Sequence, residues 1–144
     1  MSKLIIIRGV PGAGKSTYAS KLRNHLIKFG YKPNEIEHFE ADMHFIDENG
    51  NYNWNPKELG VAHKECFENC KKGLENDKIV IVSNTFVTNK ELKPYLTLAN
   101  DMFVPYEIYC CKGNWNNVHS VPNEVVENMR KNFKPVSGEI IVNE

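Results

Sequence analysis

The chain has 144 residues, of which 41% are hydrophobic and 25% are charged, and its formal net charge at pH 7 is zero. This length and composition are typical of one soluble globular domain, so we expect a single domain over residues 1–144. The charge balance argues against a protein that coats nucleic acid through bulk positive charge, because that kind of binding requires many phosphates to be neutralised. It leaves room for a local basic groove.

The apolar runs are too short for a membrane span. The longest near the N-terminus covers residues 4–7, whereas a transmembrane helix needs about 20 apolar residues. We therefore expect a cytoplasmic protein without membrane contact, whose four cysteines are reduced and partly buried. Cys66 and Cys70 share a predicted helix stripe with His63, so a metal site is an alternative, although no C-x-x-C motif or second histidine supports it.

The first third of the chain predicts strand, helix, strand and turn. Lys3–Arg8 is a continuous apolar run that suits a strand buried on both faces of a parallel sheet. Residues 16–29 have apolar side chains at helical spacing and end at a glycine. Glu35–Ala41 alternates between apolar and polar residues, as a second strand does, and Asp47–Asn55 has turn composition.

The rest of the chain continues this alternation. Asn55 and Pro56 suit the cap and first turn of a helix that runs to about Asn76. Pro94 is expected to break or bend the helix at 88–100. The other predicted elements are strands at Ile79–Val82, Tyr106–Cys111 and Glu139–Val142 and a helix at Pro122–Phe133.

Strands that alternate with helices indicate an α/β protein with three layers and a mostly parallel sheet. Residues Gly9–Thr17 read G-V-P-G-A-G-K-S-T and match the P-loop pattern G-x-x-x-x-G-K-[ST]. The glycines let backbone amides turn inward around a phosphate, and the helix that follows directs its positive end at the same anion. Lys15 can reach the β- and γ-phosphates, and the Ser16 hydroxyl can ligate Mg²⁺.

The pattern thus predicts binding of a purine nucleoside triphosphate, with ATP and Mg²⁺ as the cofactors. The expected phosphate-binding residues are Gly12, Ala13, Gly14, Lys15, Ser16 and Thr17.

A kinase also needs a group that receives the proton of the acceptor hydroxyl. Asp42 follows the second predicted strand, at the edge where α/β sheets place their ligands. An alternative role for Asp42 is to cap a short helix at 43–47. Ser83, Asn84 and Thr85 follow the third strand, where they either face the same crevice or simply cap the strand end.

The cationic side chains and the histidines are weaker candidates for the site than the P-loop and Asp42. Arg130 lies on the predicted helix Pro122–Phe133 and can stabilise the migrating phosphoryl group, or it can merely keep the helix soluble. His44, His63 and His119 are polar groups of a site or, as lone histidines usually are, structural residues.

Several segments together resemble the polynucleotide-kinase-like branch of P-loop proteins, which includes the phage polynucleotide 5′-hydroxyl kinase domain and the kinase-like domain of the myelin cyclic-nucleotide phosphodiesterase. The segments are the P-loop, E-A-D-M-H-F at 40–45, Y-N-W-N-P-K-E-L-G-V-A-H-K-E-C at 52–66, I-V-S-N-T-F at 81–86, E-L-K-P-Y at 91–95, and H-S-V-P at 119–122 followed by Met129-Arg130. The resemblance implies a kinase-type fold with a small helical lid. It also implies ATP-dependent phosphorylation of a 5′-hydroxyl at a nucleotide or nucleic-acid end, with Lys15 and Ser16 on the phosphates and metal and Asp42 as the base.

The sequence departs from this family at three positions. Ser83 stands where the third strand usually ends in an aspartate, and Asn116 stands where the family supplies a lid arginine. Phe45 stands where the phage kinase has an arginine that grips the nucleic-acid phosphate. Arg130 or Lys112 would have to substitute for the lid arginine. The alternatives to a polynucleotide kinase are therefore an ATP-binding module with little transfer activity and a kinase of small metabolites.

Overall fold

The computed structural model describes residues 1–113 and 121–143. Its centre is a five-stranded sheet of β1 (Lys3–Arg8), β2 (Ile36–Phe39), β3 (Ile79–Asn84), β4 (Tyr106–Cys111) and β5 (Ile140–Val142) in the order β2-β3-β1-β4-β5. Every neighbouring pair of strands is parallel. This confirms the predicted α/β class with a parallel sheet.

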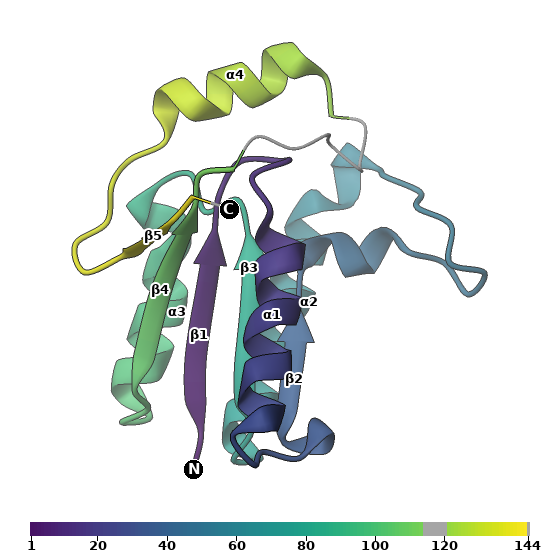
Figure 1. Cartoon of the computed structure of the whole chain (residues 1–144). Coiled ribbons are helices and arrows are strands. Elements are labelled where there is room, and N and C mark those ends of the chain that lie inside the picture. Colours follow the sequence, from purple (N-terminus) through teal and green to yellow (C-terminus); the bar gives the residue numbers. More distant parts are fainter. Residues whose placement is uncertain (114–120, 144) are drawn as a thin grey trace.

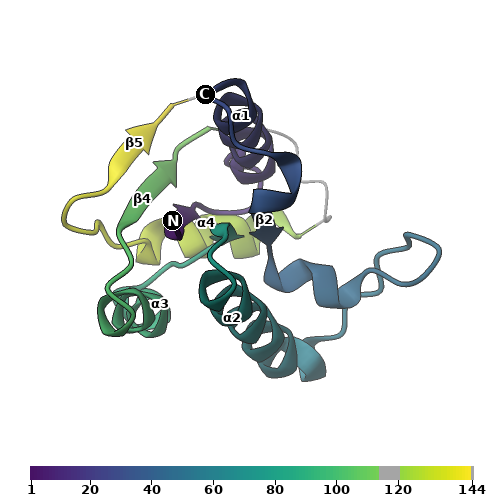
Figure 2. The same cartoon turned by 90° about the horizontal axis from the view of Figure 1, so that it is seen from below.

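Helices cover both faces of the sheet (Figures 1 and 2). The helix α1 (Lys15–Lys28) lies on one face, and α2 (Leu59–Glu75) and α3 (Asn89–Asp101) lie on the other. A fourth helix, α4 (Asn123–Asn132), crosses above the carboxyl ends of the strands, in the position expected for the lid (Figure 1). Among the described residues, no helix combines the length and the apolar character that crossing a bilayer requires.

The apolar side chains of β1 alternate between two cores. Leu4 and Ile6 pack with α2 and α3, whereas Ile5 and Ile7 pack on the side of α1 and α4. Each of the four is at most 2% exposed, and burial of such a side chain stabilises the fold by about 1.5–3 kcal/mol. The continuous apolar run that predicted a doubly buried strand is therefore explained.

Three local predictions need correction. The strand β2 is shorter than predicted, because a 3₁₀ helix begins at Ala41 and extends to Phe45. The second helix opens with a 3₁₀ turn, Pro56–Glu58, where the Asn55 side chain accepts a hydrogen bond from the backbone N–H of Lys57, as a cap does. The helix α3 continues through Pro94 instead of breaking there.

The strand order places β1 at the middle of the sheet, between β3 and β4. The chain leaves β1 toward one edge to form β2 and β3, and then crosses to the other side of β1 to form β4. In open α/β sheets, ligands bind outside the carboxyl ends of the strands at such a switch point. The loop after β1, which is the predicted P-loop, lies at this point.

Candidate functional site

The P-loop joins the end of β1 to the start of α1. Gly12 and Gly14 have φ angles of 84° and 94°, which non-glycine residues rarely adopt. Gly14 is the residue that precedes α1, and Lys15 is the first residue of the helix. The amino end of α1, with its free amides and positive dipole end, therefore faces the loop, as anion binding requires.

Gly9 is held between the ends of two strands. Its N–H donates to the carbonyl of Thr85 at 3.2 Å, and a Cβ at this position would lie 2.9 Å from the carbonyl oxygen of Cys111. On the other side of the loop, the N–H of Gly113 donates to the carbonyl of Ala13 at 3.1 Å. The segments that follow β3 and β4 thus fix both ends of the P-loop.

The Lys15 side chain folds back over its own loop. Its Nζ donates to the carbonyl oxygen of Val10 at 3.0 Å. Burial lowers the pKa of the Lys15 ammonium, and the negative charges of Glu40 and Asp42 oppose part of this shift. The predicted phosphate-binding lysine and the predicted base therefore lie within one electrostatic environment.

Glu40 also lies in the candidate site, although the sequence patterns did not single it out. Its Oε1 accepts hydrogen bonds from the Ser16 hydroxyl at 2.9 Å and from the Ser83 hydroxyl at 2.8 Å. The Nε2 atom of His38 lies 2.7 Å from Ser83 Oγ and 3.4 Å from Glu40 Oε1. Burial alone would raise the pKa of Glu40, but the hydrogen bonds from His38, Ser83 and Ser16 and the charge of His38 outweigh it and lower this pKa to about 2.

Asp42 lies within the 3₁₀ helix Ala41–Phe45, in its first turn. The residue at the cap position is Glu40, whose side chain makes no capping hydrogen bond, so the alternative that Asp42 caps a helix at 43–47 is wrong. Asp42 Oδ1 accepts a hydrogen bond from the Tyr52 hydroxyl at 3.1 Å. Burial and the neighbouring Asp42 charge raise the pKa of Tyr52, so its hydroxyl stays protonated and orients the carboxylate.

The polar residues at the end of the third strand have separate roles. Ser83 and Asn84 are the last two residues of β3 and are buried. The Asn84 side chain accepts a hydrogen bond from the N–H of Ala41 at 2.8 Å and donates to Cys66 Sγ at 3.6 Å. Asn84 therefore joins β3 to the start of the segment that carries Asp42, whereas Ser83 contacts Glu40 directly.

Within the part of the chain that the structure describes, the histidines and cysteines form no group that could hold a metal ion. His44 lies between Glu58 and Glu65, whose hydrogen bonds to its ring raise its pKa. His63 is exposed, while Cys66 and Cys70 are buried and free. No group of three or more His, Cys, Asp or Glu side chains that could hold a metal ion occurs within residues 1–113 and 121–143. His119 and Asn116 lie outside the described residues.

The two predicted substitutes for the lid arginine lie together. Arg130 and Lys112 line a cavity of about 170 Å³ with Val10 of the P-loop, Cys111 and Phe133. Arg130 also pairs with Glu127 one turn earlier on α4, at 3.4 Å, and is about one-third exposed. The structure thus brings both cations next to the P-loop.

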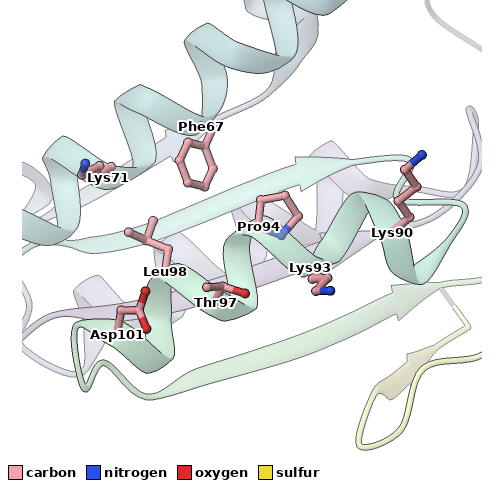
Figure 3. A pocket seen from close by; sticks show the side chains of 8 residues that line it. All are labelled: Phe67, Lys71, Lys90, Lys93, Pro94, Thr97, Leu98 and Asp101. Carbon is pink, nitrogen blue, oxygen red and sulfur yellow. The ribbon is translucent and has the colours of Figure 1, made fainter.

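A separate concave region of about 450 Å³ lies between α2 and α3 (Figure 3). Phe67 of α2 and Leu98 of α3 point into the space between the helices, and Lys71, Lys90 and Lys93 lie among the residues around it. None of the lining residues belongs to the P-loop or to the segment with Glu40 and Asp42, so this region is separate from the candidate site.

Comparison with known proteins agrees with the geometry. A family model described as AAA domain (AAA_33) matches residues 4–136. The chain belongs to this AAA domain family. It is 28% identical over 151 residues to the uncharacterized protein PM0531 of Pasteurella multocida (strain Pm70), covering 99% of this chain and 83% of that protein. It is 34% identical over 98 residues to human NEDD4-binding protein 2, a match that spans 67% of this chain but 5% of the human protein.

Solved structures share the fold at low sequence identity. Kti12 of Chaetomium thermophilum, in complex with ADP-AlF3, has a TM-score of 0.67 at 16% identity, with 96% of this chain and 88% of that chain covered. A sugar kinase of Janibacter sp. HTCC2649 has a TM-score of 0.64 at 13% identity, covering 99% and 85%. A chain of the Pnkp1/Rnl/Hen1 complex has a TM-score of 0.58 at 19% identity, covering 88% and 38%. The fold is therefore that of P-loop kinase-like proteins.

Proposed function

We propose that the protein is a kinase that transfers the γ-phosphoryl group of ATP to a hydroxyl group, with the 5′-hydroxyl of a nucleotide or polynucleotide end as the acceptor. The observation that carries the proposal is the convergence of the P-loop lysine and two carboxylates, Glu40 and Asp42, at the carboxyl edge of the sheet. The negative charges of both carboxylates act on Lys15. The kinases among the structural neighbours support transfer, and the order of the sequence motifs supports the acceptor class.

In this proposal the P-loop amides and Lys15 hold the β- and γ-phosphates. The acceptor hydroxyl oxygen forms a bond to the γ-phosphorus while the bond from that phosphorus to the β–γ bridging oxygen breaks, and ADP leaves. Asp42 receives the hydroxyl proton, and Tyr52 keeps its carboxylate oriented through the 3.1 Å hydrogen bond. Arg130 and Lys112 supply positive charge to the migrating group. Mg²⁺ bound at Ser16 would neutralise charge on the phosphates.

An acceptor screen with γ-labelled ATP tests the proposal. It covers oligonucleotides with 5′-hydroxyl ends, nucleosides, nucleotides and small alcohols. We expect label on the 5′-hydroxyl acceptors, no label with Lys15→Ala, and a loss of at least about a hundredfold with Asp42→Asn, the usual size of a general-base effect. Asp101→Asn, at the exposed end of α3, is the matched control and should keep the activity. Transfer that survives Asp42→Asn would remove Asp42 from the mechanism.

One observation favours a second candidate function, transfer to a small alcohol that is not a nucleotide. Phe45 is 4% exposed and packs in the core with α2, so it offers nothing to the phosphate of a nucleic-acid strand at the position where the phage kinase has an arginine. Label on small alcohols but not on oligonucleotides would favour this candidate. Tight ATP binding without transfer to any acceptor would instead indicate a nucleotide-binding module.

A further inference from the structure

The carboxylate of Glu40 connects three parts of the site. Ser16 lies in the first turn of α1, Ser83 lies at the end of β3, and Glu40 follows the last residue of β2. Both hydroxyls donate to one oxygen of Glu40, at 2.9 Å and 2.8 Å. Glu40 thus contacts the P-loop residue expected to bind magnesium and also the β3 residue at which the similar family carries an aspartate.

Glu40 has the charge that a magnesium ligand needs. Its side chain is 18% exposed, and its Oε1 accepts hydrogen bonds from two hydroxyl groups, as a carboxylate does. Ser83 and His38 approach it from β3 and β2 and hold it in place. An anion kept this far from bulk water favours a cation beside it.

Magnesium in nucleotide sites is usually held by one or two carboxylates, the substrate phosphates and several waters, and not by a cage made of protein alone. The described part of the chain fits this type, since it has a hydroxyl and a carboxylate in contact but no cluster of three acidic, histidine or cysteine ligands. The end of β3 contributes Ser83 and Asn84, which carry no charge.

We propose that Glu40 is the magnesium-positioning carboxylate of this protein and takes the place of the aspartate that β3 lacks. The proposal rests on the proposed function, because the magnesium ion arrives with the nucleotide. Ser83 retains a role as the donor that fixes Glu40. In this protein the carboxylate thus follows β2 instead of ending β3, and it still lies next to Ser16.

The contrasting explanation is that Glu40 only fastens α1 to β3. Nucleotide affinity measured by calorimetry with Mg²⁺, and again with EDTA, separates the two. With Glu40→Gln we expect metal-free ADP and ATP affinity within about twofold of the original protein. The strengthening of ATP binding by Mg²⁺ should fall by about 10–100-fold, the usual effect of losing a group that supports a metal. Glu68→Gln, on the exposed side of α2, is the control and should change neither value.

A carboxylate swap provides a rescue. In the double variant Glu40→Gln/Ser83→Asp, an aspartate occupies the β3 position again, and we expect most of the magnesium effect to return. Full retention of the magnesium effect in Glu40→Gln would overturn the proposal, and so would an equal loss of affinity with and without metal. If Glu40→Gln keeps the full magnesium effect and the original protein transfers phosphate, the role of Glu40 is refuted but the proposed kinase function is not.

A more conservative variant covers the case in which Glu40→Gln does not fold. Glu40→Asp keeps the charge but shortens the side chain, so we expect it to fold and to shift the preferred cation from Mg²⁺ toward the larger Ca²⁺ or Mn²⁺, as read from the affinity of ATP with each ion. An unchanged preference would contradict a role in positioning metal. If the original protein binds neither ATP nor ADP, the proposed function and this inference both fail.

Discussion

The guanidinium of Arg8 and the carboxylate of Glu139, 131 positions apart in the chain, form an ion pair at 2.7 Å in which their side chains are 0% and 7% exposed. Arg8 also donates two hydrogen bonds to the carbonyl of Phe86, at 3.0 and 2.7 Å, and its Cζ lies 4.0 Å from the centre of the Phe133 ring. Arg8 directly precedes the P-loop. It therefore fastens the segment that follows α4 to the strand that leads into the phosphate site.

Removal of this cation should strongly destabilise the protein. Arg8→Met leaves Glu139 buried without its partner, and breaking a buried pair in this way costs about 3–5 kcal/mol in the free energy of unfolding. Lys3→Met is the matched control, because Lys3 pairs with Glu107 at 2.9 Å but both side chains are more than one-third exposed; it should cost less than about 1 kcal/mol. Urea unfolding measures both. Equal losses of unfolding free energy in the two variants would show that the buried Arg8 pair stabilises the protein no more than the exposed Lys3 pair does.

The first glycine of the P-loop should not accept a side chain. A Cβ in Gly9→Ala would lie 2.9 Å from the Cys111 carbonyl and 3.0 Å from Ala13 Cβ, so we expect a loss of about 1–3 kcal/mol and weaker ATP binding. In contrast, nothing lies within 4 Å of a Cβ at Gly60, in the first turn of α2. Gly60→Ala should stabilise the protein by up to about 1 kcal/mol, through helix propensity. Thermal unfolding compares the two, and a tolerated Gly9→Ala would refute the close approach.

Arg130 should affect turnover more than binding. Arg130→Ala removes a cation from the cavity beside Val10, and we expect kcat to fall by at least about tenfold while ATP affinity changes little. Lys131→Ala, on the same helix but exposed, should leave kcat unchanged. Lys112→Ala is expected to lower kcat as well, since Lys112 lines the same cavity. Equal activities of the Arg130 and Lys131 variants would contradict the assignment.

Acid should remove the stabilisation that Glu40 provides. The pKa of Glu40 in the folded protein is about 2, compared with an ordinary value of 4.5. Because the folded value is the lower one, the contribution is fully present above pH 4.5 and is lost as the pH falls toward 2. The difference in unfolding free energy between the original protein and Glu40→Gln should therefore shrink on acidification from pH 6 to pH 3. A difference that stays constant over this range would contradict the prediction.

Local patterns predicted the parts of the structure that local forces determine. The apolar run at Lys3–Arg8 and the glycine spacing at Gly9–Thr17 each specify a backbone conformation by themselves, and the structure has a strand and a P-loop there. The alternative that Pro94 breaks its helix was wrong, because a helix whose Leu92 and Tyr95 are buried gains more from packing than it loses with one backbone hydrogen bond.

Contacts between residues that are far apart in the chain could not be predicted from the sequence. Glu40 looked like an ordinary residue of an alternating strand, and its role depends on Ser16 and Ser83, which the parallel arrangement of the strands brings to the same edge. Arg8 likewise looked like the polar end of a strand, and its complete burial depends on Glu139 at the far end of the chain. The only available signal for Glu40 was its place directly before Ala41 and Asp42, at the end of a strand.

The bond between the Lys15 ammonium and the Val10 carbonyl has a consequence for ligand affinity. The ammonium has already lost much of its hydration in the folded chain, and it rests on a neutral oxygen only 3.0 Å away. Dehydration of this charge is thus included in the free energy of folding and not in that of association. When an anion binds, the ammonium exchanges a neutral carbonyl partner for a negatively charged one. Binding of a phosphate in the loop should therefore raise the melting temperature of the protein.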